Sequence, residues 1–440
     1  MFRRKIENTL LTWKNTVDKK PLVIKGCRQC GKTSSVLDFA KKNYKNVIYI
    51  DFHKEKDLCK LFDGSLEIDY LIMVLSATIP TAKFEPGKTC IVLDEIQDCP
   101  QARASLKFFK LDGRFDVICT GSLLGVNGYN SDDSAISIPV GFETIVDMYP
   151  MDFEEWLWAN ELPDSIFSFL HNCLEQEIVI PDAIHERMRQ LLLQYIVVGG
   201  MPDAVKTFFN THDINAVIAV QKNIIEEYKA DMVKYARHED KNRIRECFES
   251  IPRQLSKENK KFTYSDVRKG GRSKEYVGCL QWIEDAGIIR RCYNITTTEL
   301  PLGGNAISDS FKVYMSDTGL FVSMLDEGTQ SDILQGDLLS YKGAIFENVM
   351  ADFLGKMGRK LYYYHKTDGI EIDFVMRYKG KCTPIECKAQ TGNAKSMSTL
   401  LKHPEKYHVY NALKLGNYNI GRQGSLLTLP FYMGFLLTEI

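Results

Sequence analysis

The stretch that decides the fold is Pro21-Leu-Val-Ile-Lys-Gly-Cys-Arg-Gln-Cys-Gly-Lys-Thr33. It opens with a short apolar run, Leu22–Ile24, and ends where a helical pattern begins. A strand, a loop of the form G-x-x-x-x-G-K-T and a helix, in this order, predict a phosphate-binding loop. The backbone N–H groups of such a loop and the positive end of its helix hold a di- or triphosphate. We expect the loop to bind ATP through Gly26, Cys27, Arg28, Gln29, Cys30, Gly31, Lys32, Thr33 and Ser34.

Two carboxylates are expected to complete this nucleotide site. Short apolar strands alternate with helical segments over residues 1–150, which predicts a parallel α/β sheet with its ligand at the carboxyl ends of the strands. Asp94 and Glu95 directly follow one apolar strand. Thr33 and Asp94 are then expected to hold Mg²⁺, Lys32 to reach the β- and γ-phosphates, and Glu95 to act as general base on the attacking water. The expected strands are Leu22–Ile24, Val47–Phe52, Cys90–Glu95 and Phe115–Thr120.

Other polar residues of this segment are candidates for phosphate contacts. Thr120 and Ser122 follow the strand beside the acidic one, so either hydroxyl is a candidate γ-phosphate sensor or a simple turn residue. Phosphoryl transfer also favours an arginine, and the sequence leaves Arg28, Arg103 and Arg114 as alternatives.

The nucleotide-site motifs carry a family resemblance. They read G-x-R-Q-x-G-K-T, V-L-D-E-I-Q and C-T-G-S-L-L-G, followed by I-P-V-G and Y-P-M-D-F-E-E-W. Nearly end to end, the sequence resembles prokaryotic AAA-type ATPases that carry a C-terminal domain of unassigned function. The resemblance implies an additional-strand P-loop fold with the acidic and sensor strands adjacent.

The bulk composition favours a soluble, cytoplasmic protein. No apolar run reaches the roughly 18 residues that a membrane span needs, and no apolar segment of signal-peptide length follows the basic start. The 12 cysteines lack a framework spacing, so we expect reduced thiols. Cys27 and Cys30 form a C-x-x-C without the second half of a zinc site, which leaves an oxidisable pair as a minor alternative.

The middle of the chain is expected to contain two modules. Residues 151–238 show helical spacing and are read as a lid, with Asp152 and Glu155 as a capping box and Pro202 in the first turn of a helix. Residues 239–335 read as helix, turn, helix and strand, which predicts a winged helix-turn-helix. Within them, residues 253–274 carry eight Lys or Arg against two Asp or Glu. Such a concentration of charge favours phosphate contacts with DNA, and the alternative is a structural or protein-binding module.

The last segment, residues 336–440, carries charged residues on one predicted helix and two predicted strands. Glu347 lies on a predicted helix, and Asp373 lies in a predicted strand, Ile370–Val375. Glu386 and Lys388 share one face of a further predicted strand, Thr383–Lys388. In the order D-x(n)-E-x-K, these residues resemble the restriction-endonuclease-like α/β fold. The resemblance implies that Glu347, Asp373 and Glu386 hold Mg²⁺ and that Lys388 activates water for phosphodiester attack. The alternative is a nuclease-derived scaffold used only for binding. A further strand is predicted over Tyr407–Leu413.

Together these patterns predict a Mg²⁺-dependent ATPase that acts on DNA through a winged-helix and a nuclease-like domain, with Glu95, Lys32, Asp373, Glu386 and Lys388 as catalytic residues. The rival hypothesis is a nucleotide-gated regulatory switch that binds protein partners without cleavage. A metabolite phosphotransferase fits the multi-domain layout less well. The sequence indicates no membrane partner and leaves a homo-oligomer open.

Overall fold

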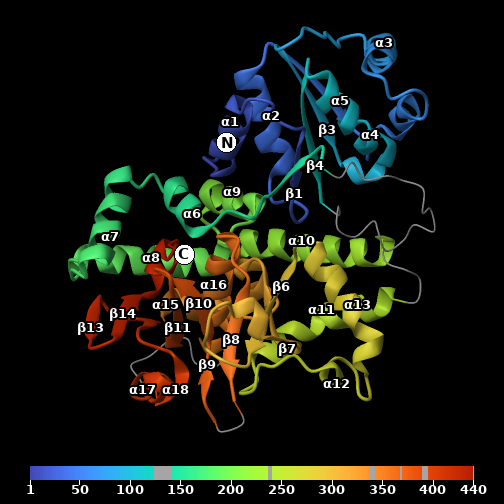
Figure 1. Ribbon diagram of the computed structural model, residues 1–440. Helices are drawn as coiled ribbons and strands as arrows, with labels where there is room; N and C mark the ends of the chain where they lie inside the picture. Colours follow the sequence, from blue (N-terminus) through green and yellow to red (C-terminus); the bar gives the residue numbers. More distant parts are fainter. Residues whose placement is uncertain (123–140, 236–239, 337–341, 367–368, 389–394, 440) are drawn as a thin grey trace. The chain divides into compact units, whose positions relative to one another are not determined.

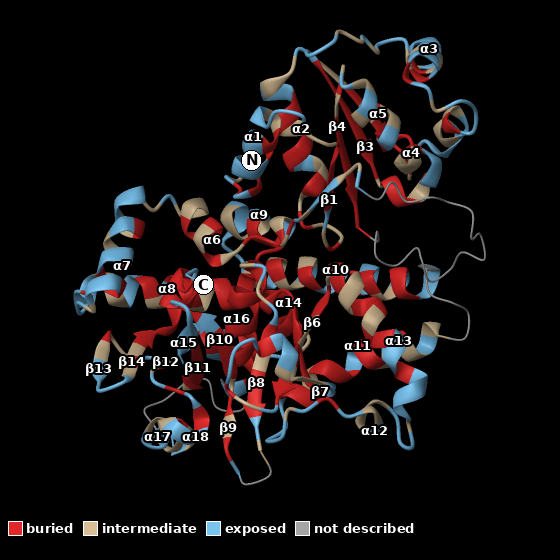
Figure 2. Ribbon diagram, viewed as in Figure 1, coloured by how far each residue is buried: buried red, intermediate tan, exposed pale blue. Residues whose placement is uncertain are grey.

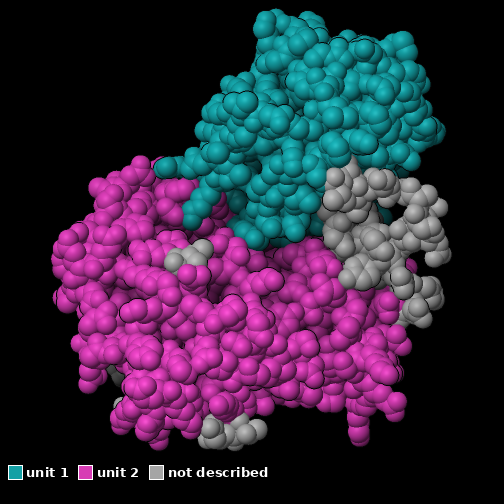
Figure 3. All heavy atoms as spheres, viewed as in Figure 1, with its two compact units in different colours: residues 1–150, 231–239 teal, residues 151–230, 240–440 magenta. Residues whose placement is uncertain are grey.

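The computed structural model describes residues 1–122, 141–235, 240–336, 342–366, 369–388 and 395–439. They divide into two compact units, residues 1–150 with 231–239 and residues 151–230 with 240–440 (Figure 3). The motif positions 123–125 and 138–140 and the lid end 236–238 lie outside the described residues. Throughout the described ranges, no helix has the length and apolar character needed to span a bilayer.

The first unit is built on a five-stranded parallel sheet of order β2-β3-β4-β1-β5 (Figure 1). The acidic strand β3 pairs in parallel with β4, and β4 separates it from the loop-bearing strand β1. This order confirms the P-loop core with adjacent acidic and sensor strands. The strand bounds are β1 Leu22–Lys25, β2 Asn46–Asp51, β3 Thr89–Asp94, β4 Asp116–Gly121 and β5 Thr144–Asp147, of which the mostly exposed β5 was not predicted.

Helices cover both faces of this sheet because its central strands are buried on both sides. All six residues of β3 are buried (Figure 2). Cys90 and Val92 pack with α1 and α2, whereas Ile91 and Leu93 pack with α3, α4 and α5 on the opposite face. The helix bounds are α1 Ile6–Asn15, α2 Lys32–Asn43, α3 Ile68–Thr78, α4 Pro100–Ala104 and α5 Leu106–Asp112.

The second unit begins with the predicted run of helices. Asp152 accepts the backbone N–H of Glu155 at 2.9 Å, and the Glu155 carboxylate accepts the N–H of Asp152 at 3.1 Å, so the capping box is confirmed. Pro202 occupies the first turn of α9, as predicted. The last of these helices, α10, continues into the first unit from Asp231. The bounds are α6 Phe153–Ala159, α7 Asp164–Gln176, α8 Asp182–Val198, α9 Pro202–Thr211 and α10 Ile214–Tyr235.

Three helices and a hairpin follow in the segment predicted as a winged helix. The hairpin strands β6 and β7 pair antiparallel, and β6 also pairs in parallel with β8. The resulting sheet, β7-β6-β8-β9, therefore joins this segment to the C-terminal one. The bounds are α11 Lys241–Leu255, α12 Tyr264–Val267, α13 Ser273–Asp285, β6 Ile289–Ile295, β7 Ala306–Met315, β8 Leu361–His365 and β9 Glu371–Ile372.

The C-terminal segment forms a second sheet of order β10-β11-β12-β14-β13. Its strands are β10 Phe374–Tyr378, β11 Lys381–Lys388, β12 Ala412–Gly416, β13 Gly421–Gln423 and β14 Leu426–Pro430. The remaining helices are α14 Thr318–Ser323, α15 Thr329–Gln335, α16 Lys342–Lys356, α17 Lys395–Lys402 and α18 Pro404–Tyr407.

Two strand predictions in this segment are wrong. The predicted strand Ile370–Val375 divides at Asp373, because β9 pairs with β8 whereas β10 pairs with β11. The predicted strand Tyr407–Leu413 starts too early, because Pro404 opens the short helix α18 and His408 ends it with a positive φ of 52°. The strand β12 begins only at Ala412.

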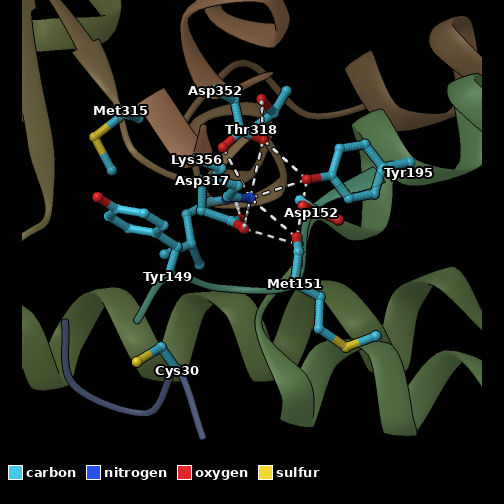
Figure 4. Close-up of polar contacts among 12 residues, drawn as sticks. Cys30, Tyr149, Met151, Asp152, Tyr195, Met315, Asp317, Thr318, Asp352 and Lys356 are labelled. Carbon is cyan, nitrogen blue, oxygen red and sulfur yellow. Dashed lines mark hydrogen bonds and ion pairs between the residues drawn. The ribbon is translucent and has the colours of Figure 1, made fainter. Parts of the chain in front are cut away.

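A buried polar network holds distant segments of the second unit together (Figure 4). The Lys356 ammonium lies 2.8 Å from the Asp352 carboxylate, and it donates to the Met151 carbonyl at 3.0 Å and to the Tyr195 hydroxyl at 2.9 Å. Tyr195 in turn donates to Asp352 at 3.0 Å. Burial raises the pKa of Asp352 to about 6 despite the neighbouring ammonium.

Candidate nucleotide site

The phosphate loop connects β1 to α2, as the sequence predicts. A side chain at Gly26 would bring its Cβ to 2.0 Å from the Met148 carbonyl oxygen, so only glycine fits there. Gln29 and Gly31 have positive φ angles of 63° and 97°. The buried ammonium of Lys32 donates to the carbonyls of Gly26 at 3.0 Å and Cys27 at 2.8 Å. These carbonyls are weak partners for a cation, so the ammonium is available to an anion that enters the loop.

Asp94 gathers hydroxyl groups from three neighbouring elements. Its carboxylate accepts hydrogen bonds from Thr33 of α2 at 2.9 Å, from Tyr49 of β2 at 2.8 Å and from Thr120 of β4. Burial, followed by the Asp94 charge, raises the pKa of Tyr49, so its hydroxyl stays protonated and donates. The oxygens of Thr33 and Asp94 together form a donor set that suits Mg²⁺.

Glu95 lies one residue beyond β3 in a left-handed backbone conformation with φ of 50°. Its carboxylate accepts hydrogen bonds from Ser122 at 3.0 Å and from the Gln97 amide. A non-glycine residue in this region is uncommon and is found where a side chain must take a special direction. The conformation and the two donors orient the Glu95 carboxylate.

The two acidic residues border a pocket of about 230 Å³. Three carboxylates and only two side-chain cations, from Arg28 and Lys54, contribute to its lining, so a polyphosphate would need further positive charge there. The lining residues are Arg28, Thr33, Tyr49, Asp51, His53, Lys54, Asp94, Glu95, Gln97 and Ser122.

The structure separates the candidate arginines. Arg103 pairs with Glu143 at 2.6 Å, and Arg114 pairs with Asp69 at 2.6 Å, and neither lines the pocket. Arg28 does line it, and its guanidinium forms an ion pair with Asp231 at 2.5 Å.

The remaining loop residues occupy varied environments. Cys27 and Cys30 are buried, and all 12 cysteines, which lie in the described ranges, are without disulfide bonds. A hydrogen bond with Cys27 lowers the pKa of Cys30 to about 6, with Lys32 contributing further. Ser34, predicted to contact the nucleotide, is exposed on α2 and does not line the pocket.

Five pocket residues were not singled out from the sequence as site residues: Tyr49, Asp51, His53, Lys54 and Gln97. The parallel register opposes Asp51 to Asp94, so both strands end at the same edge. The sequence could have indicated Tyr49 and Asp51 as site residues, because both lie near the carboxyl end of the predicted strand Val47–Phe52. Gln97 lies in the quoted motif V-L-D-E-I-Q, yet the pattern assigned it no role.

The basic residues 253–274 lie around α12 in the second unit. Lys260 pairs with Glu347 at 2.5 Å and Lys257 with Asp266 at 2.8 Å, so these charges are already compensated within the protein. Several other cations of this stretch have exposed side chains: Lys261, Arg268, Lys269, Arg272 and Lys274. An anionic partner would meet these first.

The predicted nuclease-like residues lie on α16, β11 and the β9–β10 junction. The Glu347 carboxylate contacts Lys260 at 2.5 Å, the Tyr314 hydroxyl at 2.8 Å and Lys312 at 3.5 Å. Burial alone would raise the pKa of Glu347, but Lys312 and Lys260 lower it below the usual range. Glu347 is therefore a charged side chain with protein partners.

Asp373 and Glu386 have different surroundings. Asp373 accepts the backbone N–H of Cys387 at 2.8 Å, which fixes it beside β11. Burial, and then the Glu347 charge, raises the pKa of Asp373. The Glu386 carboxylate lies 2.7 Å from the Lys388 ammonium. In the part of the chain that the structure describes, no three His, Cys, Asp or Glu side chains are grouped so as to hold a metal ion.

Comparisons with known protein families match three segments of the chain. The profile of a family described as "AAA domain" matches residues 18–157, which include the loop, β3 and β4. Two families described as domains of unknown function, DUF8612 and DUF4143, match residues 189–331 and 342–432. No curated protein matches the chain. The matched residues include the parallel-sheet P-loop core of the first unit.

Among solved structures, the chain is similar to the Walker-type ATPase PABY2304 of Pyrococcus abyssi, with 14% identity, a TM-score of 0.41 and coverage of 74% of this chain and 96% of that one. It is also similar to the Orc1 protein of Aeropyrum pernix, solved in complex with DNA, with 12% identity, a TM-score of 0.29 and coverage of 76% and 91%. Both TM-scores are too low to support a common fold over these lengths.

Proposed function

We propose that the chain binds ATP with Mg²⁺ in the 230 Å³ pocket and hydrolyses it. The observation that carries this proposal is the convergence of Thr33 and Asp94, whose side-chain oxygens lie 2.9 Å apart, directly beside the oriented Glu95. Three carboxylates at the pocket would repel a triphosphate, which explains why a divalent cation is needed. Mg²⁺ would supply charge neutralisation of the β- and γ-phosphates when it is held by Thr33 and Asp94.

Each side chain of the site would then have a separate role in ATP binding or hydrolysis. Lys32 leaves its backbone carbonyl partners and neutralises phosphate charge. Ser122 and Gln97 hold the Glu95 carboxylate, which accepts a proton from the attacking water. Ser122 lies at the pocket and is the better γ-phosphate sensor, whereas Thr120 is fully buried and acts through Asp94.

The Lys32→Ala variant tests nucleotide binding. Loss of a charged hydrogen-bond donor costs about 1.5–3 kcal/mol, so we expect affinity for a fluorescent ATP analogue to fall by roughly tenfold to a hundredfold. Lys41→Ala, an exposed lysine on the same helix, is the matched control. Equal affinities of the two variants, with unchanged thermal stability, would remove the nucleotide assignment.

We further propose that the exposed cations of residues 253–274 bind the DNA backbone. The support is a set of exposed cations around α12, next to a hairpin of β6 and β7 that follows α13 as a wing would. Phosphate contacts release counterions, so they make affinity fall with salt concentration.

Charge reversal tests this DNA-binding proposal. Lys260 is a poor choice because it pairs with Glu347, so the test combines Lys261→Glu, Lys269→Glu and Arg272→Glu. We expect weaker duplex binding and a slope of log affinity against log salt that is shallower by roughly two to three. A control with the same charge change replaces three other exposed lysines, Lys360, Lys381 and Lys402. Equal slopes for the two triple variants would contradict the proposal.

For the C-terminal segment, the ion pairs of Glu347 favour a binding role over DNA cleavage. A carboxylate that already has two lysine partners and a tyrosine is a poorer metal ligand than a solvated one. We therefore keep two proposals for this segment: Mg²⁺-dependent DNA cleavage by Asp373, Glu386 and Lys388, and a nucleotide-gated switch that binds protein partners without cleavage. The support for cleavage is the position of Asp373 beside β11, which carries Glu386 and Lys388.

A further inference from the structure

The ion pair between Arg28 and Asp231 joins the phosphate loop to the end of helix α10. Its nitrogen–oxygen distance is 2.5 Å, and both residues belong to the first unit. The Asp231 side chain is 8% exposed, whereas that of Arg28 is 34% exposed and lines the nucleotide pocket. The cation of the pair therefore reaches the pocket, while its counter-charge is buried behind it.

This arrangement affects the charge that a nucleotide would meet. Arg28 is the pocket-lining arginine among the three candidates, and it shares the pocket with the carboxylates of Asp94 and Glu95. An ion pair with a buried carboxylate neutralises the guanidinium, so the pocket loses one of its few positive charges. A phosphate group and a carboxylate both bind the guanidinium group of arginine, so a nucleotide phosphate and Asp231 would compete for Arg28.

We propose that Asp231 withholds Arg28 from the nucleotide, that ATP binding opens this ion pair, and that Arg28 is the residue that then contacts the nucleotide phosphates. The proposal rests on the nucleotide-binding function proposed above. It also gives α10 a role in regulation, because opening the pair releases the end of a helix whose residues 214–230 belong to the second unit.

The Asp231→Asn variant tests the competition, because asparagine keeps the shape of the side chain but removes its charge. We expect affinity for a fluorescent ATP analogue with Mg²⁺ to rise by roughly twofold to fivefold, the factor for loss of one competing, partly exposed ion pair. Arg28→Ala should weaken binding, and adding Asp231→Asn to it should change nothing further, because the competition needs both residues.

Glu226→Gln is the matched control, since Glu226 lies on the same helix and pairs with Lys229 instead. Its affinity should equal that of the unmodified chain. If Asp231→Asn leaves affinity unchanged or lowers it while the unmodified chain binds nucleotide, the competition is wrong and the nucleotide site stands. If the unmodified chain binds no nucleotide, the proposed function itself is wrong. An equal effect of Asp231→Asn with and without Arg28 would also overturn the proposal.

Discussion

Asp94 shows what the sequence could and could not predict about a single residue. Asp94 follows an apolar strand downstream of a phosphate loop, and this position was sufficient to predict that it lies close to Thr33. The hydrogen bond from Tyr49 was not predicted, because it depends on which strand lies next to β3 and in which register. The sequence also did not predict which of the three candidate arginines lines the pocket. Arg103 and Arg114 are held elsewhere by tertiary partners, Glu143 and Asp69.

The buried carboxyl group of Asp352 is expected to make the unfolding free energy depend on pH. Burial raises its pKa from the ordinary 3.8 to about 6, so the folded protein holds a proton that the unfolded chain releases between these two values. Its contribution to stability is present below pH 3.8 and is lost as pH rises through about 6. The unfolding free energy relative to Asp352→Asn should therefore fall by roughly 2–3 kcal/mol over that window.

Denaturant titrations of both proteins at pH 4, 5, 6 and 7 measure this difference. Asp182→Asn, which removes an exposed carboxylate in the first turn of α8, serves as the control for a change of the same chemical type. A difference between the unmodified chain and Asp352→Asn that stays constant or increases with pH would show that Asp352 is charged throughout.

At the scale of elements, local signals predicted the first unit well. A glycine-rich loop, buried β-rich runs and their alternation with helices specify β1 to β4 and their shared edge. The strand β5 was missed because it has only four residues, is mostly exposed and contains just two apolar side chains, Ile145 and Val146. Pairing between distant strands was also inaccessible: β6 and β8 are neighbours, and Asp373 lies where the chain passes from one sheet to the other. Hydrophobic periodicity specifies a strand but not its partner.

The junction at Asp373 leads to a test of the nuclease-like element. If β10 and β11 carry a cleavage site, the protein with Mg²⁺ or Mn²⁺ should cut single-stranded, duplex or branched DNA, and Asp373→Ala or Lys388→Ala should each abolish cutting because a metal ligand or the water-activating group is lost. Lys402→Ala, an exposed lysine on α17, is the control. Absence of cutting by the unmodified protein, or cutting that survives both substitutions, would assign this segment a binding role.

At the scale of the whole molecule, the chain combines a parallel-sheet P-loop core, similar to the AAA domain family, with a second unit of different architecture. The sequence predicted four segments from changes in pattern and charge. The described residues form two compact units, and the basic and C-terminal segments share one sheet, so the four segments stay a prediction. Composition marks where a pattern changes, but it does not report which segments pair. We propose that nucleotide binds to the first unit and, by opening the ion pair between Arg28 and Asp231, releases the end of α10.

The most direct test of ATP hydrolysis is the steady-state turnover of Glu95→Gln beside that of the unmodified chain and of Glu67→Gln, an exposed control residue. The amide keeps the shape of the side chain but cannot accept the proton from water, so we expect unchanged ATP affinity with turnover lower by roughly a hundredfold or more. Glu67→Gln should hydrolyse ATP normally. Undiminished turnover in Glu95→Gln would contradict the assignment of this pocket as the hydrolytic site.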